Sequence, residues 1–443
     1  MLLSVSIENW RSFAERAEFS MLAGNERQFN ETLQRIKSRR MRVLPLSAIY
    51  GGNASGKSNF IKAIAFARKL IVNGNLPNAR IPVEPFKLDK KHMKKPFTIS
   101  FEIFTNNKRY EYGFSATAEK IIEEWLIEIG SNREWELFRR GEKEFYVNEN
   151  KVSDAENVVQ LSMLINMTRK NQLFLFQSID QNFSQFSDIY NWFRDDLIFM
   201  APDDRFGPTI GRYFSKEDSL SAFLDSMLHK LDTGVQELSI KKMNLEDLHA
   251  PKGMINDMKE QLSDGKTAII SNFSEDELFF ASMSDGELEI EKLVSSHTDN
   301  DGNSVSFDLT EESDGTRRLM HLGFVFWELS RLKSQKTIFV DEIDRCLHSQ
   351  LLRRLIYEYQ KTCAADTRTQ LIFTTHDLLL MDQQLLRRDE MWFTERDRKG
   401  RSSIFSLADF KDVRYDKDVR KSYLQGRYGA IPRMLADCVF EKE

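Results

Sequence analysis

The sequence contains little of what marks a secreted, fibrous or membrane-spanning protein. Its three cysteines, Cys346, Cys363 and Cys438, form no CxxC pair and have no histidine partners, so we expect neither a disulfide framework nor a structural zinc site. Nine prolines and 20 glycines among 443 residues exclude a collagen-like or linker-dominated chain. No apolar run approaches the roughly 20 residues of a membrane helix. The opening stretch alternates, which argues against a signal peptide. We therefore expect a soluble, cytoplasmic protein that does not contact a membrane.

The composition that remains is that of a large globular protein. Hydrophobic residues make up 41% of the chain and 33 are phenylalanine, which is enough for a sizeable core. The length predicts about three domains, or one large domain with an inserted lobe. The formal net charge of −5 does not exclude nucleic acid, because local basic patches matter more than the sum. One such patch spans Arg35 to Arg42, where five basic residues are either a solvated connector or a contact for a phosphate backbone.

Hydrophobic patterning divides the chain into three segments. Residues 1–150 predict paired strands at the start, a buried strand from Leu44 to Tyr50, a helix after it, and a β meander from about residue 83. Residues 151–262 predict an inserted helical lobe, with one apolar helix face from Leu220 to Leu231. Residues 263–443 predict two strands joined by a turn at 299–303, then alternating strands and helices. This pattern is typical of an α/β fold with a parallel sheet whose strand ends carry the chemistry.

The strongest motif follows the buried strand and matches GxxxxGK[ST]. Backbone N–H groups of such a loop cradle phosphates, and the following helix adds positive potential at its N-terminus. Lys57 would reach the β- and γ-phosphates, and the Ser58 hydroxyl would bind Mg²⁺. The sequence therefore predicts an ATP site made by Gly51, Asn53, Ala54, Ser55, Gly56, Lys57, Ser58 and Asn59.

Two carboxylates follow the apolar strand Thr337 to Val340. At the end of a buried strand beside the phosphate loop, Asp341 would hold Mg²⁺ and Glu342 would polarise the attacking water as a general base. Alone, such a pair could equally be helix N-terminal charge. Together with the phosphate loop, the pair favours catalysis.

Two further motifs are ambiguous when each is taken alone. His376 ends the apolar strand from Gln370 to Thr374, where it is either structural or a contact for the γ-phosphate, the role we favour. Ser313 and Gly315 precede an apolar-faced helix. They form either an ordinary helix cap or an anion site with a hydroxyl, N–H donors and close backbone approach.

The four motifs in this order resemble the ATP-binding cassette (ABC) ATPases of the SMC/RecF/OLD type. The opening from Ile7 to Phe13 is similar to the "NFRSF" turn of that group, with Trp10 in place of the usual phenylalanine. The resemblance implies an ABC ATPase head, with a mixed β lobe, a parallel-sheet RecA-like core and an inserted helical lobe. It also implies that Ser313 and Gly315 contact the γ-phosphate from a second subunit, that His376 is the switch histidine, and that Leu347 to Ser349 is the D-loop. The signature reads Ser-Asp-Gly rather than Ser-Gly-Gly, and Gln172 and Gln177 are the candidates for the Q-loop.

Within this group the chain most resembles ATPase subunits of phage-defence operons, such as that of the PARIS system and RloA- and AbiL-like proteins. The segment from Tyr423 to Pro432 looks like a tail that recurs in them. Only 67 residues follow His376, too few for the Toprim nuclease domain of OLD proteins. The resemblance thus implies a homo-oligomer with heads paired around ATP and Mg²⁺, a separate Toprim- or nuclease-like toxic effector, and a phage-encoded trigger.

Two other functions stay open at this point. The first is a RecF-like DNA-repair or DNA-end-processing ATPase that binds DNA directly through the basic patch around Arg39 and Arg40 and the lysines Lys90, Lys91, Lys94 and Lys95. The second is a scaffold that binds ATP without hydrolysing it. Glu342 argues against the second, because an inactive site has no need of a general base.

Overall fold

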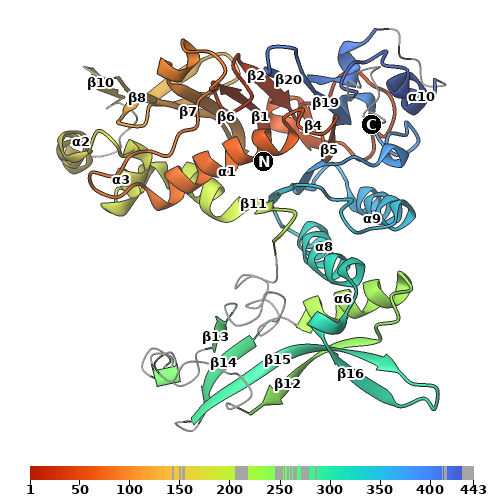
Figure 1. Ribbon diagram of the computed structural model, residues 1–443. Coiled ribbons are helices and arrows are strands. Elements are labelled where there is room, and N and C mark those ends of the chain that lie inside the picture. Colours follow the sequence, from red (N-terminus) through yellow and green to blue (C-terminus); the bar gives the residue numbers. More distant parts are fainter. Residues whose placement is uncertain are drawn as a thin grey trace, which may run out of the picture. The chain divides into compact units, whose positions relative to one another are not determined.

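The computed structural model covers the whole chain and divides it into two compact units. The first consists of Met1–Met200, Leu332–Ile343 and Gln360–Glu443, and the second of Ala201–Arg331 and Asp344–Tyr359. The residues that the structure describes are 1–141, 144–148, 151, 155–204, 218–244, 253, 255–256, 259, 262, 267–270, 279–284, 287–411, 413 and 417–431. Strands and helices of both units are drawn in Figure 1.

An antiparallel sheet of seven strands forms one layer of the first unit. Its strand order is β10-β9-β8-β7-β6-β1-β2. The strands are β1 (Leu2–Glu8), β2 (Ala17–Ser20), β6 (Phe97–Thr105), β7 (Lys108–Ala116), β8 (Ile121–Ile129), β9 (Glu134–Arg140) and β10 (Phe145–Val147). The predicted pairing of the N-terminal strands is confirmed, with Val5 opposite Phe19, and so is the meander after residue 83.

A six-stranded sheet forms the other layer and positions the predicted site. Its order is β11-β17-β18-β5-β19-β20, in which all neighbouring pairs but the last are parallel. The strands are β11 (Leu197–Met200), β17 (Thr337–Val340), β18 (Gln370–Thr374), β5 (Leu46–Tyr50), β19 (Met391–Arg396) and β20 (Ser402–Ser406). Strands β5, β17 and β18 are buried along their whole length, which explains why they are continuous apolar runs. The predicted α/β fold with a parallel sheet is confirmed.

Helix α1 (Lys57–Asn73) packs its apolar stripe against the antiparallel sheet (Figure 1). Phe60 contacts Phe13 and Phe19, and Phe66 stacks on Trp10 with ring centroids 4.8 Å apart. Trp10 is 2% exposed and fills this layer of the core. Aromatic packing between the opening turn and α1 therefore fixes the helix that leads out of the phosphate loop.

The segment after residue 150 contributes to both units. Its first part supplies helices and a strand to the first unit: α2 (Ala155–Met167), α3 (Phe174–Asp180), α4 (Ser187–Asn191), a π-helical turn (Trp192–Asp196) and β11. Beyond Met200 the second unit begins, and there Glu237–Met243 forms a strand, β12. The short apolar run Leu197–Met200 has no alternation, so its pattern alone does not separate a buried strand from a helix. About a quarter of the predicted lobe 151–262, including 205–217 and 245–252, lies outside the described residues.

The second unit combines an antiparallel sheet with two packed helices. The sheet contains β12, β13 (Thr267–Ile270), β14 (Phe279–Ser284), β15 (Glu287–Thr298) and β16 (Ser304–Asp308). The predicted turn at 299–303 joins β15 and β16, as expected. Helix α6 (Asp218–Lys230) buries Leu220, Leu224 and Leu228, which confirms its apolar face. It packs on α8 (Asp314–Ser330) at Gly323, where an added Cβ would lie 2.2 Å from Leu224 Cδ2.

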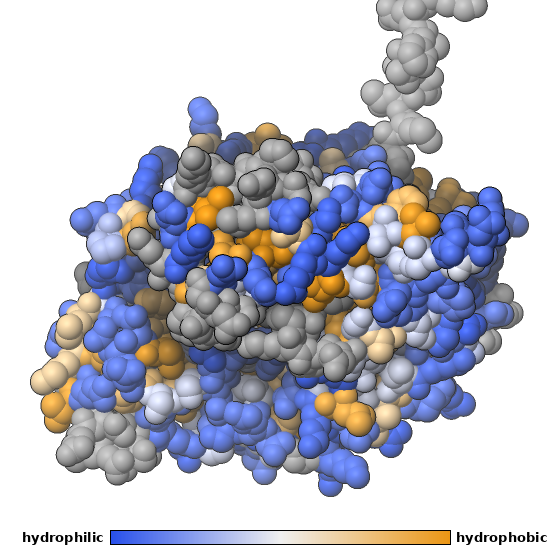
Figure 2. All heavy atoms as spheres, turned by 90° about the horizontal axis from the view of Figure 1, so that it is seen from below, coloured by the Kyte–Doolittle hydropathy of each residue, from blue (hydrophilic) through white to orange (hydrophobic). Residues whose placement is uncertain are grey.

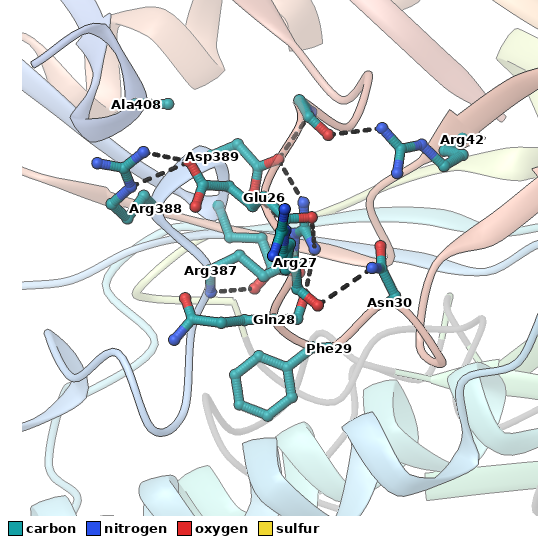
Figure 3. A network of polar contacts seen from close by, with 12 residues as sticks. Glu26, Arg27, Gln28, Phe29, Asn30, Arg42, Arg387, Arg388, Asp389 and Ala408 are labelled. Atoms are coloured by element: carbon teal, nitrogen blue, oxygen red, sulfur yellow. Dashed lines mark hydrogen bonds and ion pairs between the residues drawn. The ribbon is translucent and has the colours of Figure 1, made fainter. Parts of the chain in front are cut away.

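A buried ionic network ties the loop after β2 to the turn before β19 (Figure 3). Arg387 is fully buried and donates from Nε and Nη2 to the two oxygens of Asp389, each at 2.8 Å. Asp389 also accepts from the Gly24 N–H at 2.8 Å, and Arg387 Nη1 donates to the Gln28 carbonyl. Next to this pair the pKa of Glu390 is raised to about 8, chiefly by burial; the charge of Asp389 adds to the shift, and Arg387 opposes it. Since a buried charge must be paired, this network determines where the loop lies.

One face of the protein is largely hydrophilic. On the face drawn in Figure 2, most coloured atoms belong to hydrophilic residues, with smaller groups of apolar ones. Within the described part of the chain, no helix has both the length and the hydrophobicity to cross a bilayer.

Candidate functional site

The predicted phosphate loop has the backbone of a strand–loop–helix anion site. It leaves the buried strand β5 at Tyr50 and enters α1 at Lys57. Gly56 caps the helix with φ of 120°, a conformation that side chains disfavour, and an added Cβ would lie 2.6 Å from Ser402 Oγ. At Gly51 an added Cβ would lie 2.5 Å from Thr394 Oγ1. The two glycines of the motif are therefore required by close approach as well as by backbone conformation.

Lys57 lies inside this loop. Its Nζ donates to the carbonyl oxygens of Gly51 at 2.8 Å and Gly52 at 3.3 Å, and the residue is 5% exposed. These two bonds hold the ammonium group against the loop. A bound phosphate could replace the two carbonyl oxygens as its hydrogen-bond acceptor. Ser58 and Asn59, the next residues of the helix, are half-buried. Asn59 Nδ2 donates to Ser12 Oγ at 2.9 Å, so its side chain is turned toward the opening turn.

The outer side of the loop is held by β19 and β20. Ser55 Oγ lies 2.6 Å from Thr394 Oγ1, and Ser402 Oγ donates to the Ser55 carbonyl at 2.6 Å. Sequence reasoning missed Thr394 and Ser402. The turn residues between them predict a hairpin but give no signal of what the hairpin contacts. The contacts turn the Ser55 side chain outward, which leaves the interior of the loop to backbone N–H groups.

Thr374 links the two predicted carboxylates. Its hydroxyl donates to Asp341 Oδ1 at 2.5 Å and accepts from the Glu342 N–H at 2.8 Å, and the residue is fully buried. Asp341 is 4% exposed, whereas Glu342 is half-buried with φ of 49°. The left-handed backbone of Glu342 is uncommon and is held by this hydrogen bond. Sequence reasoning missed Thr374, because its contact with the acid pair exists only once β17 and β18 lie side by side.

His376 follows the strand that lies between the other two. It is exposed, and the preceding residue is tied to β5 because the Thr375 N–H donates to the Ile49 carbonyl at 3.1 Å. Parallel strands β17, β18 and β5 end at the same sheet edge. The sheet thus brings the acid pair, His376 and the phosphate loop together at one edge of the first unit.

Ser313 and Gly315 lie in the second unit, at the start of α8. Ser313 is exposed and caps the 17-residue helix, its Oγ accepting from the Thr316 N–H at 3.1 Å. An added Cβ on Gly315 would lie 3.0 Å from the Cys346 carbonyl, so the segment leading to Leu347, His348 and Ser349 packs closely on the helix start. The exposed helix N-terminus offers N–H donors and a hydroxyl on the surface.

Gln172 lies away from the phosphate loop. Its Oε1 accepts from the Asn75 N–H at 2.9 Å, just beyond the C-terminal end of α1. A helix of 17 residues is about 25 Å long, so Gln172 and the loop are at opposite ends of it. Gln177, the other candidate, lies on α3.

A cavity of about 300 Å³ opens beside the phosphate loop. Arg11 lines it and pairs with Glu84 at 2.6 Å, while Phe86 and Leu88 add apolar surface. The other lining residues are Ser12, Ala54, Asn59, Pro85, Lys87, Arg396 and Gly400. Mixed apolar and charged walls next to an anion site are suited to the nucleoside part of a nucleotide.

Oxygen donors dominate the end of the sheet where Mg²⁺ is expected. The Ser58 hydroxyl and the Asp341 carboxylate are the ligand types that this ion takes together with phosphate oxygens and water. The donor chemistry therefore fits the ion. Within the described residues, no group of three or more His, Cys, Asp or Glu side chains is arranged to hold a metal.

Comparison with known proteins gives one family match and distant similarities to many solved structures, two of which are described here. A family profile described as "AAA domain, putative AbiEii toxin, Type IV TA system" matches residues 46–382, about three quarters of the chain. Among solved structures, the SMC head domain from Thermotoga maritima is 14% identical, with a TM-score of 0.38, over 91% of this chain and 98% of that one. An SMC head bound to the C-terminal winged-helix domain of ScpA is 12% identical, with a TM-score of 0.40, over 91% and 97%. No curated protein matches significantly.

Proposed function

This chain belongs to the AAA-domain family that matches residues 46–382 and is an ATPase, and we propose that it serves bacterial anti-phage defence. In this proposal two copies pair their heads around ATP in the cytoplasm and control a separate toxic effector, a nuclease, in response to a phage-encoded trigger. The family description, which names an abortive-infection toxin and a toxin–antitoxin system, supports the defence role. The resemblance to the ATPase subunits of PARIS-like and RloA- or AbiL-like systems points the same way.

One observation supports the proposal that the heads of two copies pair. Ser313 presents an exposed, capped helix N-terminus with its hydroxyl and N–H groups, whereas the phosphate loop, acid pair and His376 meet at one sheet edge of the first unit. An exposed helix start with a glycine at its second residue is suited to an anion brought by another molecule. In the proposal, Ser313 and Gly315 of one copy contact the γ-phosphate held by the other.

Each site residue then has a defined task. The loop amides and Lys57 bind the phosphates, and Ser58 and Asp341 hold Mg²⁺, which when bound neutralises charge on the phosphate oxygens. Glu342 accepts a proton from the attacking water, and Thr374 fixes its backbone through the bond to the Glu342 N–H. His376, exposed at the end of β18, contacts the γ-phosphate.

A mixing experiment tests the shared site. Lys57→Ala and Ser313→Arg chains are each expected to be inactive in ATP hydrolysis. In an equal mixture about half of the dimers contain both chains, and each of these has one intact site, so about a quarter of the wild-type rate should return. Lys57→Ala mixed with Glu342→Gln is the matched control, because both lesions affect the same half of the site and no rescue is expected. Absence of rescue in the first mixture would refute pairing through Ser313.

The defence role is tested in cells. A bacterium that carries this gene with its genomic neighbours should resist a phage that lyses the same strain without them, and Lys57→Ala should abolish the resistance. Unchanged plaque numbers with the wild-type genes, tested against a broad panel of phages, would contradict the proposal.

A second candidate is a DNA-binding ATPase of RecF type, supported by the lysines near the short helix His92–Lys94. Lys87, Lys90, Lys91, Lys94 and Lys95 are all exposed in this stretch. Such a cluster is suited to contacts with a phosphate backbone. Affinity of the purified chain for duplex DNA that falls steeply with salt, with no partner protein present, would favour this candidate. Affinity that is weak at low salt would exclude it.

A further inference from the structure

A segment near the end of the described chain touches the phosphate loop directly. The Gly52 N–H donates to the carbonyl oxygen of Ala430 at 3.1 Å. The same oxygen accepts from the Tyr423 hydroxyl at 2.8 Å. Ala430 and Tyr423 are 2% and 5% exposed, so water does not compete for these bonds. Residues 417–431 are called the strap below.

Aromatic stacking fixes the strap on the strand beside β5. The rings of Tyr423 and Tyr428 both stack on Phe393 of β19, with centroids 5.5 and 6.1 Å apart and interplanar angles of 15° and 23°. Within the strap, helix α10 (Val419–Leu424) is capped by Asp418, which accepts from the Lys421 N–H at 2.9 Å. The strap thus has its own anchor, and the bond to Gly52 is made from a fixed position.

The backbone at the contact point takes an unfavourable form. Ala430 has φ of 58°, a left-handed conformation that alanine rarely adopts. The preceding Gly429 has φ of 67°, and an added Cβ there would lie 2.8 Å from Glu395 Oε2. These two residues turn the Ala430 carbonyl toward the loop. Strain of this kind persists only where surrounding contacts impose it, and it is concentrated at functional sites.

We propose that the strap positions the phosphate loop for ATP, and that Tyr423 is a positioning residue that acts through the Ala430 carbonyl. The proposal rests on the proposed role of the loop in binding phosphates. Lys57 now holds the carbonyls of Gly51 and Gly52, which it must release when its ammonium turns to a phosphate. The strap holds the N–H of Gly52 and is independent of that exchange.

The strap therefore keeps the first turn of the loop ordered while Lys57 changes partners. Without it, the loop must lose conformational freedom at the moment of binding, which weakens ATP affinity without altering the chemical step. Burial raises the pKa of Tyr423 to about 12, so its hydroxyl remains protonated and able to donate at any physiological pH.

The chain contains a matched control for this role. Tyr428 stacks on the same Phe393 ring and is 4% exposed, but its hydroxyl has no hydrogen-bond partner among the described residues. Tyr423→Phe and Tyr428→Phe each remove one buried hydroxyl and keep the ring. Only the first removes a bond to the carbonyl that holds the loop.

The experiment measures steady-state ATP hydrolysis and, without nucleotide, hydrogen–deuterium exchange of the peptide that contains Gly52. We expect Tyr423→Phe to raise the KM for ATP about fivefold and leave kcat within about twofold. Exchange of the loop peptide should become several times faster. Tyr428→Phe should change neither. Gly429→Ala, which must displace the strap from Glu395, should act like Tyr423→Phe with a larger effect.

The exchange measurement separates this proposal from the one on which it rests, because it needs no ATP. Faster exchange together with a raised KM supports the strap. Equal behaviour of the two phenylalanine variants in both measurements would overturn it. Faster exchange with an unchanged KM would also overturn it, since the strap would then hold the loop without serving ATP.

Discussion

Replacing Thr374 by valine removes the hydroxyl that joins the two carboxylate residues and changes little else. The side chain is fully buried, and valine has nearly the same shape. Two hydrogen bonds are lost: one donated to the Asp341 carboxylate and one accepted from the Glu342 N–H. A hydrogen bond to a charged group is worth about 1.5–3 kcal/mol, and a neutral one about 1 kcal/mol. The variant should therefore be less stable by about 3 kcal/mol.

The effect on catalysis follows from the backbone of Glu342. Its left-handed conformation loses the bond that holds it, so the carboxylate moves away from the position that the attacking water requires. Misplacement of a catalytic group by about 1 Å can cost about 100-fold in rate. We expect kcat for ATP hydrolysis to fall by about 10- to 100-fold, and Thr374→Ser to restore most of it.

Thr337 provides the control, because it is equally buried and lies at the other end of the adjacent strand. Its hydroxyl donates to Gln370 Oε1 at 3.0 Å. Thr337→Val should cost about 1 kcal/mol of unfolding free energy and leave kcat unchanged. Denaturant unfolding and steady-state turnover on the three variants measure both quantities. If Thr374→Val and Thr337→Val had the same kcat, the positioning argument would be refuted.

Two further predictions concern Glu342 and Glu390. Glu342→Gln should bind ATP normally, hydrolyse it at least 100-fold more slowly and accumulate as paired heads in light scattering; hydrolysis at the wild-type rate would mean that another residue is the general base. Burial raises the pKa of Glu390 from 4.5 to about 8, so the folded protein holds this proton more tightly than the unfolded chain does. The stability that this contributes is complete below about pH 4.5 and is lost as the pH rises to about 8. The side chain in Glu390→Gln does not ionise, so the Tm of this variant relative to wild type should rise between about pH 5 and pH 8. A Tm difference that stays constant over this range would contradict burial as the cause of the raised pKa.

The sequence predicts the elements of the site better than their contacts. The strands 337–340 and 370–374 and the strand before the phosphate loop are apolar runs that end in polar residues, so their position and chemistry are readable from the pattern. The fixing contacts are not readable. Thr374, Thr394 and Ser402 are ordinary strand residues, and their hydroxyls acquire a role only because strands distant in sequence become neighbours.

In the segment after residue 150, one element can be predicted from hydrophobic periodicity and another cannot. The helix face at Leu220, Leu224 and Leu228 follows from a period of 3.6 and is present as predicted. The strand Leu197–Met200 does not follow from periodicity, because four apolar residues fit a buried strand and a helix turn equally well. Its neighbour β17, more than a hundred residues later, decides the outcome.

The strand order of the parallel sheet has a consequence for biosynthesis. Both neighbours of β5, the strand that leads into the phosphate loop, come from the last part of the sequence, at Gln370–Thr374 and Met391–Arg396. Until the ribosome has made β18 and β19, both edges of the apolar strand β5 lack the strands with which they pair in the folded sheet. Such long-range pairing is slow and leaves the nascent chain open to aggregation. ATP affinity should consequently arise only after translation has passed β19.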